Sequence, residues 1–219
     1  MKKQRKQFLV IGLGRFGSSV AKALSELGHE VLALDKQQEL VDAMAPYVTE
    51  AICADSSDED VLRSVEPSVF DAAVVSIGQD TRGSILITVL CKEMGCPYVI
   101  AKAQDDLHGK VLTKVGADKV VYPERDMGQR LARSLSMNHF IDMMELADNF
   151  EMVECAVPDE WEGRSILELN IRRNYGISIV AIKRGSKLIP SPTAEEMFSA
   201  DDVLLMLGET DKISKIIGR

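Results

Sequence analysis

The chain has 219 residues, 46% hydrophobic and 27% charged, which is typical of a soluble globular protein. Its formal net charge of −8 argues against a nucleic-acid-binding protein, because such proteins need a concentrated basic surface. No apolar run reaches the roughly 18 residues of a membrane-spanning helix, and we expect neither a membrane span nor a signal peptide. The four cysteines form no CxxC pair, so we expect them to be reduced and buried, as in a cytoplasmic protein.

From residue 8 to about 122, short apolar segments alternate with longer helical ones. The short segments are apolar almost throughout, which is typical of strands in a parallel sheet that is covered on both faces. The pattern predicts an α/β domain over residues 1–138, a doubly wound parallel sheet of Rossmann type. The expected strands are 8–13, 30–35, 50–54, 72–77, 98–103 and 119–122.

After residue 122 the alternation of short apolar segments with longer helical segments ends. Residues 123–146 read as one long helical stretch broken near Asn138, with 139–149 as a linker or crossover helix. Residues 150–219 predict a small α+β domain, too small for a second nucleotide-binding fold. Within it we expect a strand, a helical turn, a hairpin over 177–192, and a last strand and helix with Thr210 as the helix cap.

The segment "FLVIGLGRFGSSVAKAL" places Gly12, Gly14 and Gly17 between an expected strand and an expected helix. In that context the first glycine permits the tight turn, the second lets backbone N–H groups approach phosphates, and the third allows close helix–strand packing. Asp35 ends the second expected strand, where an acid can accept both hydroxyls of an adenosine ribose. Together these features predict an adenine-nucleotide site.

The turn does not distinguish NAD from ATP or ADP, since all share the ribose and phosphates. Asp55 and Ser56 follow the third strand and could border the adenine; alternatively, Ser56 or Ser57 only caps the next helix. Gly78 follows the fourth strand, where a backbone can pass close to a ligand.

Catalytic groups are scarce. None of the three histidines is expected at the carboxyl end of a strand, and no Tyr-x-x-x-Lys pair occurs. Lys102 is a lone candidate for chemistry, but a structural or phosphate-neutralising role is favoured. We therefore expect no enzyme.

Arg15 lies in the glycine turn, where its guanidinium could form bidentate hydrogen bonds to phosphate oxygens and detect a third phosphate. It is a candidate discriminator of ATP from ADP, the alternative being a solvated surface arginine. Glu124 follows the last strand and by itself would be an ordinary first-turn helix acid.

The runs "VIGLGRFG", "ADSS", "VIAKAQ", "GADKVVYPERDMG" and "NIRRNYGISIVAIKRG" resemble the RCK (KTN) regulatory subunits of bacterial potassium uptake systems of the Ktr and Trk type. The resemblance covers essentially the whole chain. It implies a homodimer that assembles into an octameric ring beneath a membrane-embedded potassium channel, on the cytoplasmic face of the membrane. It also implies that ATP favours the conducting ring and ADP the inactive one. An NAD(H)-binding redox sensor or an NAD-dependent oxidoreductase remains the alternative.

The resemblance also implies roles for particular residues. Glu124 would help bind a divalent cation beside the ATP phosphates of a dimer partner, and Arg172, Ile179 and Pro192 match positions of a cyclic di-AMP site. The expected nucleotide-binding residues are Gly12, Gly14, Arg15, Phe16, Gly17, Asp35, Lys36, Asp55, Ser56, Ile77, Gly78, Lys102 and Glu124.

Overall fold

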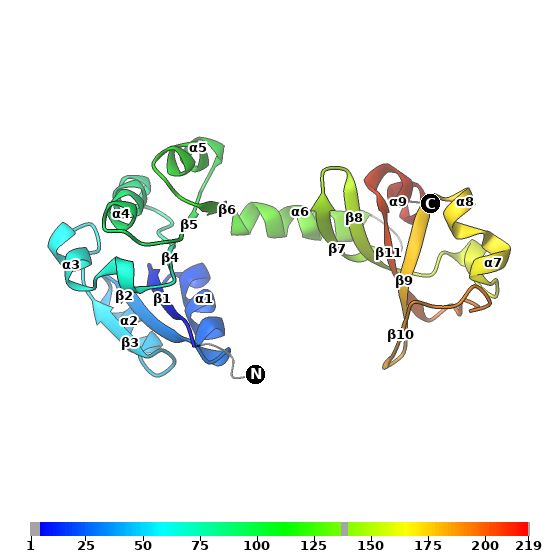
Figure 1. Cartoon of the computed structure of the whole chain (residues 1–219), viewed down its shortest axis with the longest axis horizontal. Helices are drawn as coiled ribbons and strands as arrows, with labels where there is room; N and C mark the ends of the chain where they lie inside the picture. Colours follow the sequence, from blue (N-terminus) through cyan, green and yellow to red (C-terminus); the bar gives the residue numbers. More distant parts are fainter. Residues whose placement is uncertain (1–4, 137–139, 219) are drawn as a thin grey trace. The chain divides into compact units, whose positions relative to one another are not determined.

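The computed structural model describes residues 5–136 and 140–218. The chain divides into two compact units, Met1–Pro123 and Glu124–Arg219. Figure 1 shows the helices and strands of the two units. Among the described residues, no helix combines the length and apolarity that a membrane crossing needs.

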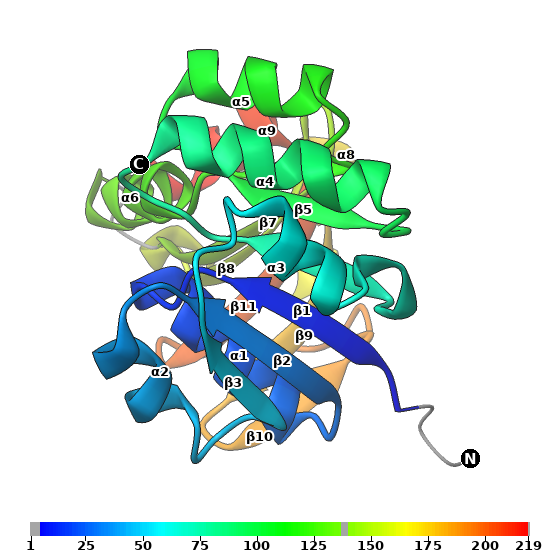
Figure 2. The ribbon, with the colours of Figure 1, turned by 90° about the vertical axis from the view of Figure 1, so that its left-hand side faces the viewer.

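Unit 1 is built on a six-stranded parallel sheet with the strand order β3-β2-β1-β4-β5-β6. Figure 2 shows the adjacent strands β1, β2 and β3 of this sheet. All six predicted strands are present, and the strand order is that of a Rossmann fold, so the predicted fold class is confirmed. The strands are β1 (Gln7–Ile11), β2 (Glu30–Asp35), β3 (Glu50–Cys53), β4 (Ala72–Val75), β5 (Val99–Lys102) and β6 (Lys119–Val121).

Helices cover both faces of the sheet because successive strand residues point to opposite sides. Leu9 and Ile11 of β1 are buried in a core that includes side chains of α3, α4 and α5. Val10, between them, is buried in a second core with side chains of α1 and α2. The helical elements are α1 (Arg15–Glu26), α2 (Gln38–Met44), α3 (Glu59–Ser64), the 3-10 helix η1 (Pro67–Val69), α4 (Thr81–Glu93) and α5 (Asp106–Lys114).

Unit 2 contains helix α6 (Pro123–Ser136), except for its first residue, and a five-stranded antiparallel sheet in the order β10-β9-β11-β8-β7. Trp161 and Phe198 are fully buried in its core, where α9 packs through Ile213, Ile216 and Ile217. The remaining elements are β7 (Phe140–Ala147), β8 (Phe150–Ala156), η2 (Asp159–Trp161), α7 (Ile166–Leu169), α8 (Ile171–Asn174), β9 (Ile177–Arg184), β10 (Lys187–Pro190), β11 (Asp202–Glu209) and α9 (Thr210–Ile217).

Two expectations for residues 123–149 need correction. Residues 140–147 form strand β7, neither helix nor linker, because they pair with β8 in an antiparallel hairpin. The turn falls at Asp148 and Asn149, with Asn149 in the left-handed region at φ 64°, as Asn tolerates in tight hairpins. The chain also divides at Pro123, earlier than the expected boundary at 138. The expected break at Asn138 lies outside the described residues.

Later elements of unit 2 match their predictions, including the β9–β10 hairpin and the β11–α9 pair. Thr210 is the first residue of α9 and Glu209 precedes it as the cap residue, so the predicted cap is displaced by one position. Cys53 is exposed, which corrects the expectation that all four cysteines are buried, whereas Cys91, Cys96 and Cys155 are buried free thiols.

Candidate functional site

A tight glycine turn joins β1 to α1 at the centre of the unit 1 sheet. Gly12 has φ +91°, a conformation that favours glycine, and its N–H donates to the Leu34 carbonyl at 2.8 Å. β1 lies between β2 and β4, and the chain returns to the sheet on opposite sides of it. Ligands of doubly wound sheets bind at this kind of switch point, beyond the carboxyl ends of the strands.

The three glycines of the turn meet different surroundings. A Cβ on Gly12 would lie 2.9 Å from the Ser76 carbonyl oxygen, and one on Gly17 would lie 1.9 Å from the Gly12 carbonyl oxygen. Around Gly14, in contrast, no atom of the described residues other than its chain neighbours lies within 4 Å of the Cβ position. Gly12 and Gly17 are therefore required by the protein's own packing, whereas Gly14 borders open space.

Gly14 is also the cap residue of α1, and no side chain caps this helix end. The first-turn N–H groups of a helix lack intrahelical acceptors and carry the positive end of the helix dipole. No acidic side chain occupies the first turn of α1. The end of α1 can therefore accept a phosphate at the open side of Gly14.

Asp35 ties the turn to the end of β2. Its carboxylate accepts the Leu13 N–H at 2.6 Å and the Gln37 N–H at 2.8 Å. A carboxylate has about four lone-pair positions, so these two bonds leave capacity for ribose hydroxyls. The predicted acid thus lies beside the glycine turn and also stabilises it.

Arg15 and Phe16 open α1 in different environments. Arg15 is exposed, as a phosphate-reading side chain has to be. The Phe16 ring is half-buried and packs against the core beneath α1 and α2.

Asp55 and Lys36 lie near each other beyond β3 and β2. Hydrogen bonds from the Ser57 hydroxyl and N–H, at 2.6 and 2.9 Å, hold the pKa of Asp55 below its usual range, with a smaller contribution from the Lys36 charge. Ser56 is buried. The cap of α3 is Asp58, which accepts the Asp60 N–H at 3.0 Å, so neither Ser56 nor Ser57 is the cap. This removes the capping alternative for Ser56.

The ends of β4 and β5 form the other side of the switch point. Ile77 and Gly78 are half-buried, and the Lys102 ammonium lies 3.9 Å from the Cβ position of Gly78. The sequence prediction missed Ser76, whose buried hydroxyl has no hydrogen-bond partner among the described residues. It lies 3.0 Å from the Cβ position of Gly17, directly behind the glycine turn.

The remaining predicted site residues lie in unit 2. Glu124 is exposed in the first turn of α6. In the described part of the chain, no three His, Cys, Asp or Glu side chains are grouped to hold a metal ion. Arg172 is exposed on α8, Ile179 lies on β9, and a Ser191 N–H bond to the Val180 carbonyl at 2.8 Å brings Pro192 alongside β9.

The two units match two known domain families. Residues 8–123 match the TrkA-N domain family and residues 152–218 the TrkA-C domain family. The chain is 44% identical over 211 residues to the Ktr system potassium uptake protein C of Bacillus subtilis, covering 96% of each chain. It is 40% identical to the Ktr system potassium uptake protein A of the same organism, over 97% of this chain and 96% of that one.

A solved structure has the same fold at lower identity. The GsuK channel bound to NAD superimposes with a TM-score of 0.71 and 17% sequence identity. The match covers 100% of this chain and 40% of the channel chain. At this identity the likeness concerns the fold.

Proposed function

Because the chain belongs to the TrkA family of regulatory subunits of bacterial potassium uptake systems, we propose that it senses adenine nucleotides and gates a membrane potassium channel. As a member of this family the chain is a regulatory subunit and not an enzyme. Gating requires no chemical step, only a ligand that binds two conformations unequally.

The observation that carries the proposal is the open space at Gly14. The neighbouring glycines are confined by the protein itself, but among the described residues, apart from its two chain neighbours, no atom lies within 4 Å of the Cβ position of Gly14. An uncapped twelve-residue helix begins there, and Asp35 stands beside the turn. This combination suits a nucleotide whose phosphates lie at α1 and whose ribose lies at Asp35.

ATP is the proposed activating ligand and ADP the inactivating one. The backbone donors of the turn serve the phosphates that both nucleotides share. The third phosphate of ATP adds negative charge, and the exposed Arg15 guanidinium is a positively charged, bidentate hydrogen-bond donor. A difference of about 1–3 kcal/mol between two conformations is enough for a regulatory coupling.

Assembly supplies the rest of the proposed mechanism. The chain forms a homodimer, and dimers form an octameric ring that docks on the cytoplasmic side of a membrane-embedded potassium channel subunit. Glu124 would help to hold a divalent cation beside the ATP phosphates of a dimer partner. Arg172, Ile179 and Pro192 of unit 2 contribute to a cyclic di-AMP site.

Asp35 also favours a second candidate ligand. A carboxylate at this position accepts the hydroxyls of any adenosine ribose, so NAD or NADH would fit the same turn. The second candidate function is accordingly an NAD(H)-dependent redox sensor.

One competition experiment separates the two candidates. We would displace a fluorescent adenine nucleotide from the purified chain with ATP, ADP, NAD and NADH, with and without magnesium. We expect ATP and ADP to displace the probe at lower concentrations than NAD or NADH does. If NADH binds more tightly than ATP and ADP, the ATP-sensing proposal is wrong and the redox-sensor function is supported instead. Light scattering on the same samples tests the ring, and a strictly monomeric chain at micromolar concentration would contradict it.

A further inference from the structure

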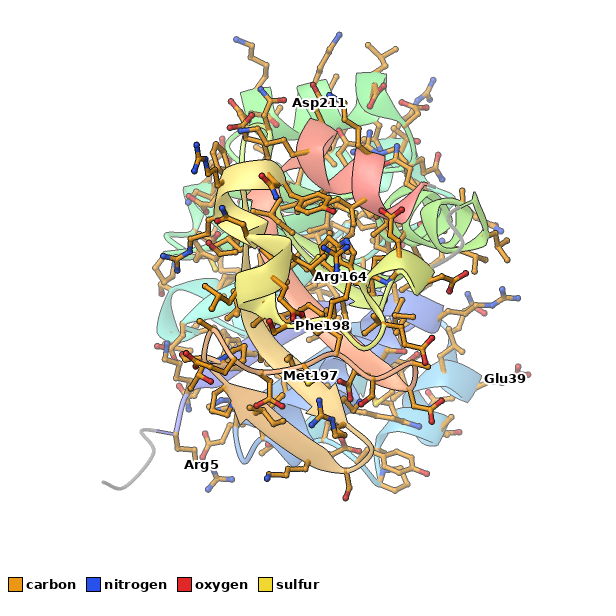
Figure 3. The ribbon with its side chains drawn as sticks, turned by 90° about the vertical axis from the view of Figure 1, so that its right-hand side faces the viewer. Arg5, Glu39, Arg164, Met197, Phe198 and Asp211 are labelled. Carbon is orange, nitrogen blue, oxygen red and sulfur yellow. The ribbon has the colours of Figure 1, made fainter. Side chains whose placement is uncertain are left out.

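Unit 2 contains a pocket of about 430 Å³ between the α8–β9 connection and the end of α9. One wall is the segment 173–176 and the other is formed by α9. Figure 3 views the side of unit 2 that carries α9, in red with Asp211 labelled, and the yellow segment of α7 and α8. Arg172, Ile179 and Pro192 do not line this pocket.

Among the described residues that line the pocket, every charged side chain is basic. Arg173, Lys212 and Lys215 are the charged side chains of the wall. Lys212 is paired with Glu209 at 2.6 Å, but among the described residues neither Arg173 nor Lys215 has an ion-pair partner. Cations gathered around one hollow repel one another, and a bound anion removes that repulsion.

The polar groups of the wall are mainly donors. Tyr175 accepts the indole N–H of Trp161 at 3.2 Å, so its own O–H remains available to a ligand. Gly176 has φ +67°, and a Cβ there would lie 2.9 Å from Cδ of Lys212. The glycine thus leaves room for the Lys212 stem to lie along the wall. Guanidinium, ammonium and phenol donors together are suited to oxyanions.

We propose that this pocket binds a small phosphorylated anion, as a ligand site separate from the glycine turn of unit 1. Its volume lies within the roughly 300–1,000 Å³ range of small-molecule sites. A phosphate ester or a pyrophosphate supplies the charge that the unpaired Arg173 and Lys215 lack.

The chain carries its own reporter for this pocket. Trp161 is the single tryptophan, and its ring centroid lies 4.9 Å from that of Tyr175. A ligand that engages the Tyr175 hydroxyl changes the indole environment and therefore the emission of Trp161. Unit 1 has no tryptophan, so an anion at the glycine turn has no such reporter next to it.

The test is a titration of the full chain with inorganic pyrophosphate, followed by Trp161 emission at constant ionic strength. The double variant Arg173→Gln, Lys215→Gln removes the two unpaired cations and keeps the Lys212–Glu209 pair. Lys187→Gln is the matched control, because it removes an exposed cation of unit 2 that does not line the pocket and belongs to no proposed site. We expect a saturable emission change in the wild type and the control, with binding at least tenfold weaker in the double variant.

Three results would overturn the proposal. The first is no saturable change in the wild type, and the second is an equal midpoint in a double variant whose circular dichroism matches the wild type. The third is an emission change with vesicles of anionic phospholipid but not with pyrophosphate, which would make the pocket a membrane contact. If the double variant does not fold, Arg173→Gln alone takes its place, with an expected weakening of at least threefold.

Discussion

Gly14 and Gly17 belong to one turn, but their substitution should have opposite consequences. A methyl group on Gly17 would meet the Gly12 carbonyl at 1.9 Å, whereas one on Gly14 meets no atom within 4 Å in the described part of the chain beyond its own neighbours. We expect Gly17→Ala to destabilise unit 1 by about 3 kcal/mol, because the backbone has to move. We expect Gly14→Ala to cost less than about 1 kcal/mol of stability, yet to weaken nucleotide binding at least tenfold.

Denaturant unfolding and nucleotide titration of both variants check this pair. Equal destabilisation by the two substitutions would contradict the packing account. Unchanged nucleotide affinity in Gly14→Ala would show that no phosphate approaches α1 at this residue.

A second prediction at the scale of single residues concerns the thiols. Cys53 is exposed, with its sulfur 3.5 Å from the Lys36 carbonyl, close to the expected adenine side of the site. Burial raises the pKa of Cys91 and of Cys155 to about 12, so those thiols stay protonated and unreactive. At pH 8 a thiol reagent should modify Cys53 first, and saturating nucleotide should slow that reaction. Mass spectrometry of the labelled peptides measures both effects, and a Cys53 rate independent of nucleotide would place the ligand elsewhere.

In unit 2, strands β9 and β11 are neighbours in the sheet and are also linked by an ion pair. Arg184 of β9 donates to both carboxylate oxygens of Asp202 in β11, at 2.8 and 2.7 Å, and also to Glu196 at 3.0 Å. The hydrogen bonds from Arg184 hold the pKa of Asp202 below its usual range although the side chain is fully buried. Losing one partner of a buried pair leaves the other charge uncompensated.

We therefore expect Asp202→Asn to destabilise unit 2 by about 3 kcal/mol. Because the folded pKa of Asp202 is lowered, its stabilisation is complete above the ordinary carboxyl value of about 3.9 and is lost as the pH falls through the lower folded value. The acid sensitivity of unit 2 below about pH 4 should accordingly be smaller in the variant. Urea unfolding of both proteins between pH 3 and 7 measures this, and parallel pH profiles would contradict the assignment.

At the scale of elements, local signals explain which predictions were correct. The alternation of short apolar runs with helical segments predicted all six strands of unit 1, because a parallel sheet covered on both faces leaves little choice of pattern. Residues 140–147 were misread because "FIDMMELA" suits a helix and a strand alike. Its conformation is set by pairing with β8, which is a tertiary contact and not a local preference.

The candidate site was predictable to the extent that it depends on local motifs. Gly12, Gly17 and Asp35 lie together as the spacing indicated. Ser76 was missed because a single serine after a strand has no distinctive pattern, and Asp58 displaced the predicted caps because several capping residues lie next to one another.

The whole molecule has separate hydrophobic cores in its two units. Within the described residues, the two core clusters of unit 1 and the core cluster of unit 2 have no buried residue in common. We expect calorimetry to resolve two transitions, since each core can melt by itself. Nucleotide should raise only the transition of unit 1, and Asp202→Asn should lower only that of unit 2. A single cooperative transition whose midpoint temperature shifts both with nucleotide and in Asp202→Asn would show that the two units unfold together.

Nucleotide sensing by the regulatory subunit is the central claim, and calorimetric titration of the chain and its Arg15 variants with ATP and ADP tests it most directly. We expect the wild type to prefer ATP, Arg15→Ala to lose this preference while keeping its ADP affinity, and Arg15→Lys to fall between them. An intermediate ATP preference is expected for Arg15→Lys because lysine keeps the positive charge but cannot form bidentate hydrogen bonds. Equal ATP preference in the wild type and Arg15→Ala, or NADH binding tighter than either nucleotide, would contradict the account.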